Sequence, residues 1–126
     1  MVGLVVVSHS AKAAEGIVEV AAEMGGDTPI EAAGGDGDGV VGTNVDRISD
    51  ALAAVDDGDG VVVLVDLGSA VMNAEVAIEM HDGEAVIADS PVLEGAVNAA
   101  VAATDPNATL ASVVEQAEAA ADIDKT

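Results

Sequence analysis

The sequence contains no cysteine, no aromatic residue and only three basic residues among its 126. Without cysteine it has no disulfide framework, no thiolate nucleophile and no Cys-based metal site. The basic residues Lys12, Arg47 and Lys125 are too few to neutralise the phosphates of a nucleic acid. Anionic membrane surfaces are excluded for the same reason. We therefore expect no nucleic-acid partner and no membrane partner.

Long apolar runs are also missing. Val61 to Val65 is an uninterrupted apolar run, but a transmembrane helix needs about 20 such residues. The first residues lack the basic flank of a signal peptide and resemble the start of a strand. We expect a soluble, cytoplasmic protein. The length favours one domain over residues 1–126.

The charge is strongly one-sided, since 24 acidic residues give a formal net charge of −21. Such a surface repels itself at low ionic strength, whereas the Debye length falls to about 3 Å in 1 M salt. The composition is typical of an extreme halophile and predicts a haloarchaeal source. We therefore interpret the charge as an adaptation to habitat and not as an indication of function.

Apolar blocks alternate with segments of helical spacing. The blocks that predict strands are Val2 to Val7, Ile30 to Ala33, Gly60 to Leu67 and Ala85 to Ala88. The helical segments run from Ser10 to about Met24, from Val45 to Val55, from about Ser69 to Met80, from Pro91 to about Ala103 and from Leu110 to Ala117. This alternation predicts an α/β fold, a mostly parallel sheet of four or more strands with helices on both faces.

Ligands of such sheets bind beyond the carboxyl ends of the strands. His9 directly follows the first predicted strand, where an imidazole suits a nucleophile or a general base. Asp66 ends the third, where a carboxylate in an apolar block needs a partner. If the two strands are adjacent, Asp66 holds one ring nitrogen and leaves the other free to attack, as in a catalytic triad.

Each of these residues also has a plainer interpretation. His9 is equally compatible with an ordinary loop histidine, and Asp66 with a partly solvated carboxylate. Ser69 caps a helix whose free N–H groups are also suited to hold a phosphoryl group on His9. Thr43 is expected to cap the helix that follows it.

Two further expectations concern residues outside this edge. His81 lies in a polar turn between a helix and a strand, so we expect it on the surface at the opposite edge of the sheet. Met72 and Met80 lie within a helical segment and are expected in the core.

The glycine-rich stretch from Gly34 to Thr43 contains a GxGxxG pattern, but it does not support dinucleotide binding. No suitably placed acid follows the next strand, and Asp36 and Asp38 would repel a pyrophosphate. No lysine follows the glycines, as a P-loop would require. A calcium-binding loop is excluded as well, because its fifth and twelfth positions do not carry the oxygen ligands that calcium needs. A receiver domain would need acidic metal ligands after the first strand, where this chain has Ser8 and His9.

Four motifs in order, VVVSHS, VGT, VDLGSAVMNAE and PVLEGAVNAA, resemble the phosphotransferase subunits of dihydroxyacetone kinases. That family is similar to the mannose-type IIA proteins of the sugar phosphotransferase system. The resemblance spans nearly the whole chain and implies a homodimeric α/β domain. It also implies that the phosphocarrier protein HPr phosphorylates His9. Because a carrier of this kind needs only an oriented imidazole and amides that hold the phosphoryl oxygens, we expect no metal or other cofactor.

The same resemblance implies roles for individual residues and for partner proteins. Asp66 would orient His9, while Gly42, Thr43, Gly68 and Ser69 would surround the phosphoryl group. The phosphoryl group would pass to ADP on a separate nucleotide-binding subunit, and then to dihydroxyacetone on a third subunit. The acidity of the chain favours apolar contacts with HPr around His9.

Two alternatives remain open. A mannose-type IIA component would share the fold and pass its phosphoryl group to a IIB protein instead. A regulatory domain without covalent chemistry would tolerate the loss of His9. The motifs DLGSA and EGA favour the kinase subunit over the first alternative.

Overall fold

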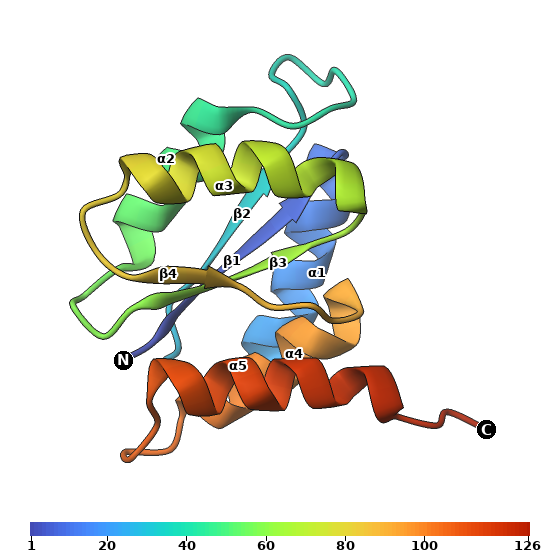
Figure 1. Cartoon of the computed structure of the whole chain (residues 1–126). Coiled ribbons are helices and arrows are strands. Elements are labelled where there is room, and N and C mark those ends of the chain that lie inside the picture. The colour runs from blue at the N-terminus through green and yellow to red at the C-terminus, as the bar shows by residue number, and fades with distance from the viewer.

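The computed structural model describes all residues from Met1 to Thr126. Its four strands are all parallel and form one sheet in the order β2-β1-β3-β4 (Figure 1). The strands are β1 (Gly3–Ser8), β2 (Ile30–Gly34), β3 (Val61–Val65) and β4 (Ala85–Ile87). The helices are α1 (Ala11–Met24), α2 (Val45–Val55), α3 (Val71–Met80), α4 (Val92–Ala103) and α5 (Leu110–Ala119), with 3₁₀ turns η1 (Gly68–Ala70) and η2 (Ala120–Asp122). The predicted fold class is confirmed.

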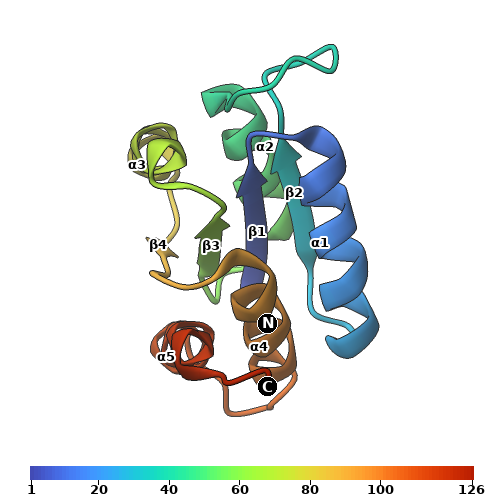
Figure 2. The same cartoon turned by 90° about the vertical axis from the view of Figure 1, so that its right-hand side faces the viewer.

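Helices cover both faces of the sheet (Figures 1 and 2). Helices α1, α4 and α5 pack on the face that presents Leu4 and Leu64, whereas α2 and α3 pack on the face that presents Val5 and Val63. Successive side chains of a strand point to opposite faces. Both faces of β1 and β3 are therefore buried, which explains their unbroken apolar sequences.

Small side chains build most of this core. The inner face of α4 consists of fully or nearly fully buried Ala96, Ala99, Ala100 and Ala103. Because alanine keeps a helix axis close to its neighbour, α4 lies against both α1 and α5 without any aromatic residue in the core.

The helix caps differ from expectation at one position. Ser10 caps α1 as predicted, with its hydroxyl accepting from the N–H of Ala13 at 3.1 Å. The predicted cap of α2, Thr43, is wrong, because Asn44 occupies that position and accepts from the N–H of Arg47 at 3.0 Å. Asn44 has the extended backbone of a cap residue, which leaves the hydroxyl of Thr43 free for other contacts.

The outer side of α3 also differs from expectation. Met72 and Met80 are 74% and 64% exposed, so their predicted place in the core is wrong. The core side of α3 is instead made by Ala74 and Ala77, with the partly buried Ile78 packed beside them. Met72, Val76 and Met80 are four residues apart and form an apolar stripe on the exposed side of the helix.

The strand β4 forms one edge of the sheet and pairs only with β3. Its outer edge has no partner strand and lies between α3 and α5 (Figure 1). None of the helices combines the length and apolarity that a membrane span requires.

Candidate functional site

Three chain segments meet at the carboxyl edge of the sheet, because β1 lies between β2 and β3. His9 follows β1, Asp66 follows β3, and the glycine-rich loop follows β2. Gly34 closes this edge tightly, since a Cβ at this position would lie 2.6 Å from the carbonyl oxygen of Ser10. The three segments that the sequence pattern placed at this edge therefore meet there.

The carboxylate of Asp66 binds His9 and its neighbour through both oxygens. Oδ1 accepts from the ring Nδ1 of His9 at 3.0 Å. Oδ2 accepts from the hydroxyl of Ser8 at 2.9 Å and from the backbone N–H of His9 at 3.0 Å. An ionised carboxylate can only accept, so Nδ1 of His9 carries the ring proton.

The surroundings of Asp66 keep it ionised. Burial by itself raises the pKa of this carboxyl group. The hydrogen bonds from the backbone and ring of His9 and from Ser8 outweigh burial and hold the pKa of Asp66 below its ordinary value. Asp66 is therefore a carboxylate at neutral pH.

The other ring nitrogen of His9 faces outward. Nε2 lies 2.9 Å from the hydroxyl of Ser69, and the His9 side chain is 24% exposed. Because Nδ1 holds the proton, Nε2 presents its lone pair and the hydroxyl of Ser69 donates to it. A neutral imidazole oriented in this way is a nucleophile that a partner can reach.

Groups that can hold an anion occur in the two segments next to His9. The backbone N–H groups of Gly68 and Ser69 begin the η1 turn and donate to no other backbone group. The N–H of Gly42 donates to the carbonyl oxygen of His9 at 2.9 Å, which brings the glycine-rich loop against the histidine. Thr43 follows directly in this loop.

Comparison with known proteins identifies the family of the chain. Residues 3–118 match the family described as EIIA-man, PTS system fructose IIA component. The chain belongs to this family. The phosphoryl donor subunit DhaM of PEP-dependent dihydroxyacetone kinase 2 from Listeria innocua is 43% identical over 106 residues, 80% of this chain and 85% of that protein.

Two further relatives cover almost the whole chain. The phosphotransferase subunit DhaM of the PTS-dependent dihydroxyacetone kinase from Lactococcus lactis is 36% identical over 116 residues, 92% of this chain and 93% of that protein. The crystal structure of EF1359, a protein of unknown function, has a TM-score of 0.80 and 29% identity, and covers 94% of each chain. The family resemblance drawn from the sequence motifs is thus confirmed.

Two residues of the site were not predicted as contributors. Ser8 is the last residue of β1 and is 1% exposed, and its hydroxyl both donates to Asp66 and accepts from the N–H of Ser10 at 3.1 Å. Asn73 of α3 donates to the hydroxyl of Thr43 at 2.7 Å. A polar residue at the end of a buried strand was a usable signal for Ser8, whereas no local pattern indicates the pairing of Asn73 with Thr43.

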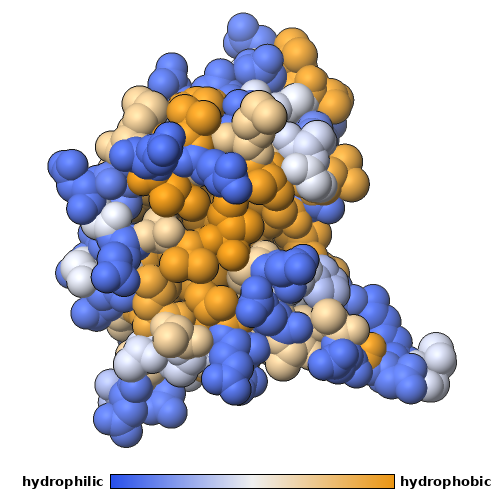
Figure 3. Space-filling model, in the orientation of Figure 1, coloured by the Kyte–Doolittle hydropathy of each residue, from blue (hydrophilic) through white to orange (hydrophobic).

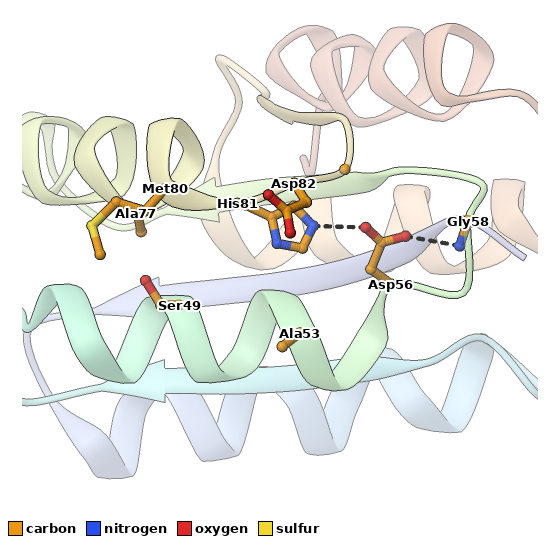
Figure 4. Close-up of a pocket in the computed structure, with 9 residues that line it drawn as sticks. Ser49, Ala53, Asp56, Gly58, Ala77, Met80, His81 and Asp82 are labelled. Carbon is orange, nitrogen blue, oxygen red and sulfur yellow. Dashed lines mark hydrogen bonds and ion pairs between the residues drawn. The ribbon is translucent and has the colours of Figure 1, made fainter.

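His81 lies at the opposite edge of the sheet, as predicted, but it is not a free surface residue. Its Nε2 lies 2.6 Å from Oδ2 of Asp56, and both side chains are 13% exposed (Figure 4). The backbone N–H of Gly58 and the ring of His81 lower the pKa of Asp56. A Cβ at Gly83 would lie 2.2 Å from Oδ2 of Asp56, so the chain approaches this pair closely.

Proposed function

We propose that this chain is the phosphoryl carrier subunit of a phosphoenolpyruvate-dependent dihydroxyacetone kinase. It accepts a phosphoryl group from HPr on Nε2 of His9 and passes it to ADP on a separate nucleotide-binding subunit. The resulting ATP then phosphorylates dihydroxyacetone on a third subunit. The observation that carries the proposal is the His9 ring, held by Asp66 at Nδ1, with Nε2 facing outward against the hydroxyl of Ser69. The names of the relatives support the choice of acceptor.

Both transfer steps need only a change of bond at phosphorus. In the first, the lone pair of Nε2 bonds to phosphorus while the P–N bond of phosphorylated HPr breaks, and the departing nitrogen keeps that electron pair. In the second, an oxygen of the terminal phosphate of ADP bonds to phosphorus and the P–Nε2 electron pair returns to His9. The proton on Nδ1 stays in place throughout, bonded to Asp66.

The phosphoryl oxygens require hydrogen-bond donors around Nε2. We assign this role to Thr43, Gly68 and Ser69. Gly42, whose N–H donates to the carbonyl oxygen of His9, would lie beside the phosphoryl group without donating to it. The backbone N–H groups of Gly68 and Ser69 are unpaired, and the Ser69 hydroxyl already points at Nε2. Donors fixed in this way favour the doubly negative phosphoryl group without a metal ion.

Apolar side chains border the reacting nitrogen and provide a docking surface for HPr. Val40 and Val41 of the glycine-rich loop are 56% and 75% exposed, and Leu67 and Met72 are 58% and 74% exposed. These exposed residues flank the segments that hold His9. Association through them depends little on charge, which suits a chain with a net charge of −21.

We further propose that the carrier is a cytoplasmic homodimer formed through β4. The open edge of β4 lies in an apolar area that extends from α3 to α5 (Figure 3). Val76 and Val86 are exposed there, and Val86 lines a shallow groove with Leu110 and Val114 of α5. An open edge strand within an apolar area is suited to pair with a second copy.

Intact mass spectrometry tests the carrier role. Wild type, His9→Ala and His81→Ala are incubated with phosphoenolpyruvate, enzyme I and HPr. The proposal predicts one acid-labile phosphoryl group on wild type and on His81→Ala, and none on His9→Ala. His81→Ala is the matched control, because it removes the other histidine of the chain and its Asp partner is not at the site. An unmodified wild type beside a labelled control acceptor would contradict the proposal.

The acceptor is tested in a second step. Labelled protein is mixed either with the ADP-loaded nucleotide-binding subunit or with a IIB protein. Formation of ATP supports the kinase subunit, and transfer to the IIB protein supports a mannose-type IIA component. A biological activity that survives His9→Ala unchanged would point to a regulatory domain.

A further inference from the structure

The side chain of Asn73 links α3 to the glycine-rich loop beside His9. Its Nδ2 lies 2.7 Å from the hydroxyl oxygen of Thr43 and 3.5 Å from the carbonyl oxygen of the same residue. A carbonyl oxygen can only accept, so the NH₂ end of the Asn73 amide faces Thr43. The contact has a defined direction, in which Asn73 donates and the Thr43 hydroxyl accepts.

This direction determines where the hydroxyl proton of Thr43 points. A threonine hydroxyl has one proton, and Thr43 donates it to no group in the unphosphorylated protein. With Asn73 bonded to one lone pair of the oxygen, the proton points away from Asn73 and can be donated to another group. Thr43 follows Gly42, which is bonded to the backbone of His9.

Asn73 lies one helical turn after the residue that contacts the reacting nitrogen of His9. Ser69, which contacts Nε2 of His9, lies four residues before Asn73 and thus one turn earlier on the same side of the helical segment. Ser69 and Asn73 together hold the ring of His9 and the hydroxyl of Thr43 on one side of α3.

We propose that Asn73 is a positioning residue that presents the hydroxyl proton of Thr43 to a phosphoryl oxygen on His9. Asn73 does not touch the phosphoryl group itself and acts through Thr43. The inference rests on the proposed function, since it requires a phosphoryl group on Nε2. It adds Asn73 to the site and makes the rate of phosphoryl transfer depend on which residue of the Asn73–Thr43 contact donates the hydrogen bond.

The substitution Asn73→Asp separates this role from a purely structural one. Aspartate has the same shape and can still bond to the Thr43 hydroxyl, but it accepts the proton instead of donating one. A contact that only anchors the loop would survive this change. A contact that directs the proton is reversed, and we expect Asn73→Asp to transfer phosphoryl groups more slowly than Asn73→Ala.

A double-mutant cycle tests whether Asn73 acts through Thr43. The single changes Asn73→Ala and Thr43→Val are each expected to slow single-turnover labelling by phosphorylated HPr by roughly fivefold, the factor that corresponds to one neutral hydrogen bond. The double variant is expected to be no slower than Thr43→Val alone. Asn73→Asp in the Thr43→Val background measures the effect of the added charge by itself.

Spectroscopy and a matched control complete the test. The ³¹P resonance of the phosphohistidine is expected to shift in Asn73→Ala and Thr43→Val alike. Asn98→Ala is the control, because Asn98 donates a similar 3.1 Å hydrogen bond to the carbonyl oxygen of Gln116 between α4 and α5. Circular dichroism checks that each variant is folded.

The outcomes distinguish this inference from the proposed function. Failure of wild type to become labelled would overturn the carrier role itself. If wild type is labelled, three results would overturn only the role of Asn73. These are additive losses of rate in the double-mutant cycle, an Asn73→Asp variant as fast as wild type, and an Asn73→Ala variant indistinguishable from Asn98→Ala.

Discussion

Replacing Asp66 by asparagine is expected to reverse the tautomer of His9. Oδ2 of Asp66 accepts from the Ser8 hydroxyl and from the backbone N–H of His9. The oxygen of the carboxamide has to take this place, because a backbone N–H can only donate. Its NH₂ group then faces Nδ1 of His9, which must release its proton and accept instead. The proton moves to Nε2 and the nucleophile is lost.

The size of the effect follows from the cost of turning the new carboxamide the other way round. If the NH₂ group faces the backbone of His9 instead, the nucleophile survives, but a half-buried N–H group loses its acceptor at a cost of about 1–3 kcal/mol. About 1.4 kcal/mol corresponds to a factor of ten in rate. We therefore expect Asp66→Asn to take up phosphoryl groups roughly 5- to 150-fold more slowly. The corresponding change in serine-protease triads, about 10⁴-fold, marks an upper limit.

Two measurements on the same samples test this prediction. Rapid-quench kinetics give the rate of labelling by phosphorylated HPr, and long-range ¹H–¹⁵N spectra show which ring nitrogen carries the proton. Asp56→Asn is the matched control, since it alters the other His–Asp pair of the chain at the far edge of the sheet. An unchanged rate in Asp66→Asn, with the proton still on Nδ1, would refute the argument that Asp66 sets the tautomer.

Three further predictions concern assembly, stability and salt. Val86→Asp is expected to convert the proposed homodimer to a monomer in sedimentation equilibrium. Val101→Asp, at a 50% exposed position on α4, is expected to leave the proposed dimer intact. Equal behaviour of the two variants would argue against pairing through β4. His81→Ala is expected to lower the free energy of unfolding by about 1.5–3 kcal/mol at pH 7, as for a hydrogen bond to a charged group. The pKa of Asp56 is lowered in the folded state, so its stabilising effect is present above its ordinary pKa of about 3.9 and is lost as the pH falls further. Denaturant titrations should therefore show the difference between wild type and His81→Ala shrinking below about pH 4, and a constant difference would contradict this account. Finally, the net charge of −21 predicts that the thermal unfolding midpoint rises between 0.1 and 1 M KCl, because the Debye length falls from about 10 to about 3 Å. A midpoint independent of salt would exclude charge repulsion as a main destabilising force.

The central pair of the site was predictable because both residues interrupt strong local patterns. His9 and Asp66 each follow an apolar block at the end of a strand, and parallel strands bring their carboxyl ends to one edge. Their contact also required β1 and β3 to be neighbours, which the sequence left as a condition. The register of Val7 with Val65 meets that condition.

Other features depend on tertiary contacts that local patterns do not encode. Helical spacing identified α3 but did not tell which side is buried, because apolar residues occur on both sides of it. Its outer side carries Met72 and Met80, whereas its fully buried residues are alanines and Ile78 packs beside them. The bond between Asn73 and Thr43 joins residues 30 positions apart and follows from the packing of α3 beside the glycine-rich loop.

The two sides of the His9 ring are held by different kinds of contact. The N–H of Asp66 donates to the carbonyl oxygen of Val7 at 3.1 Å, and the N–H of Gly35 donates to that of Ser8 at 3.1 Å. The parallel ladder therefore continues on both sides of β1 up to the histidine and fixes the backbone that holds Nδ1. On the side of the ring where Nε2 lies, the neighbouring groups belong to the exposed η1 turn and glycine-rich loop. A carrier that meets a donor and an acceptor in turn needs this division, because the ring must keep one tautomer while its surroundings fit two different partners.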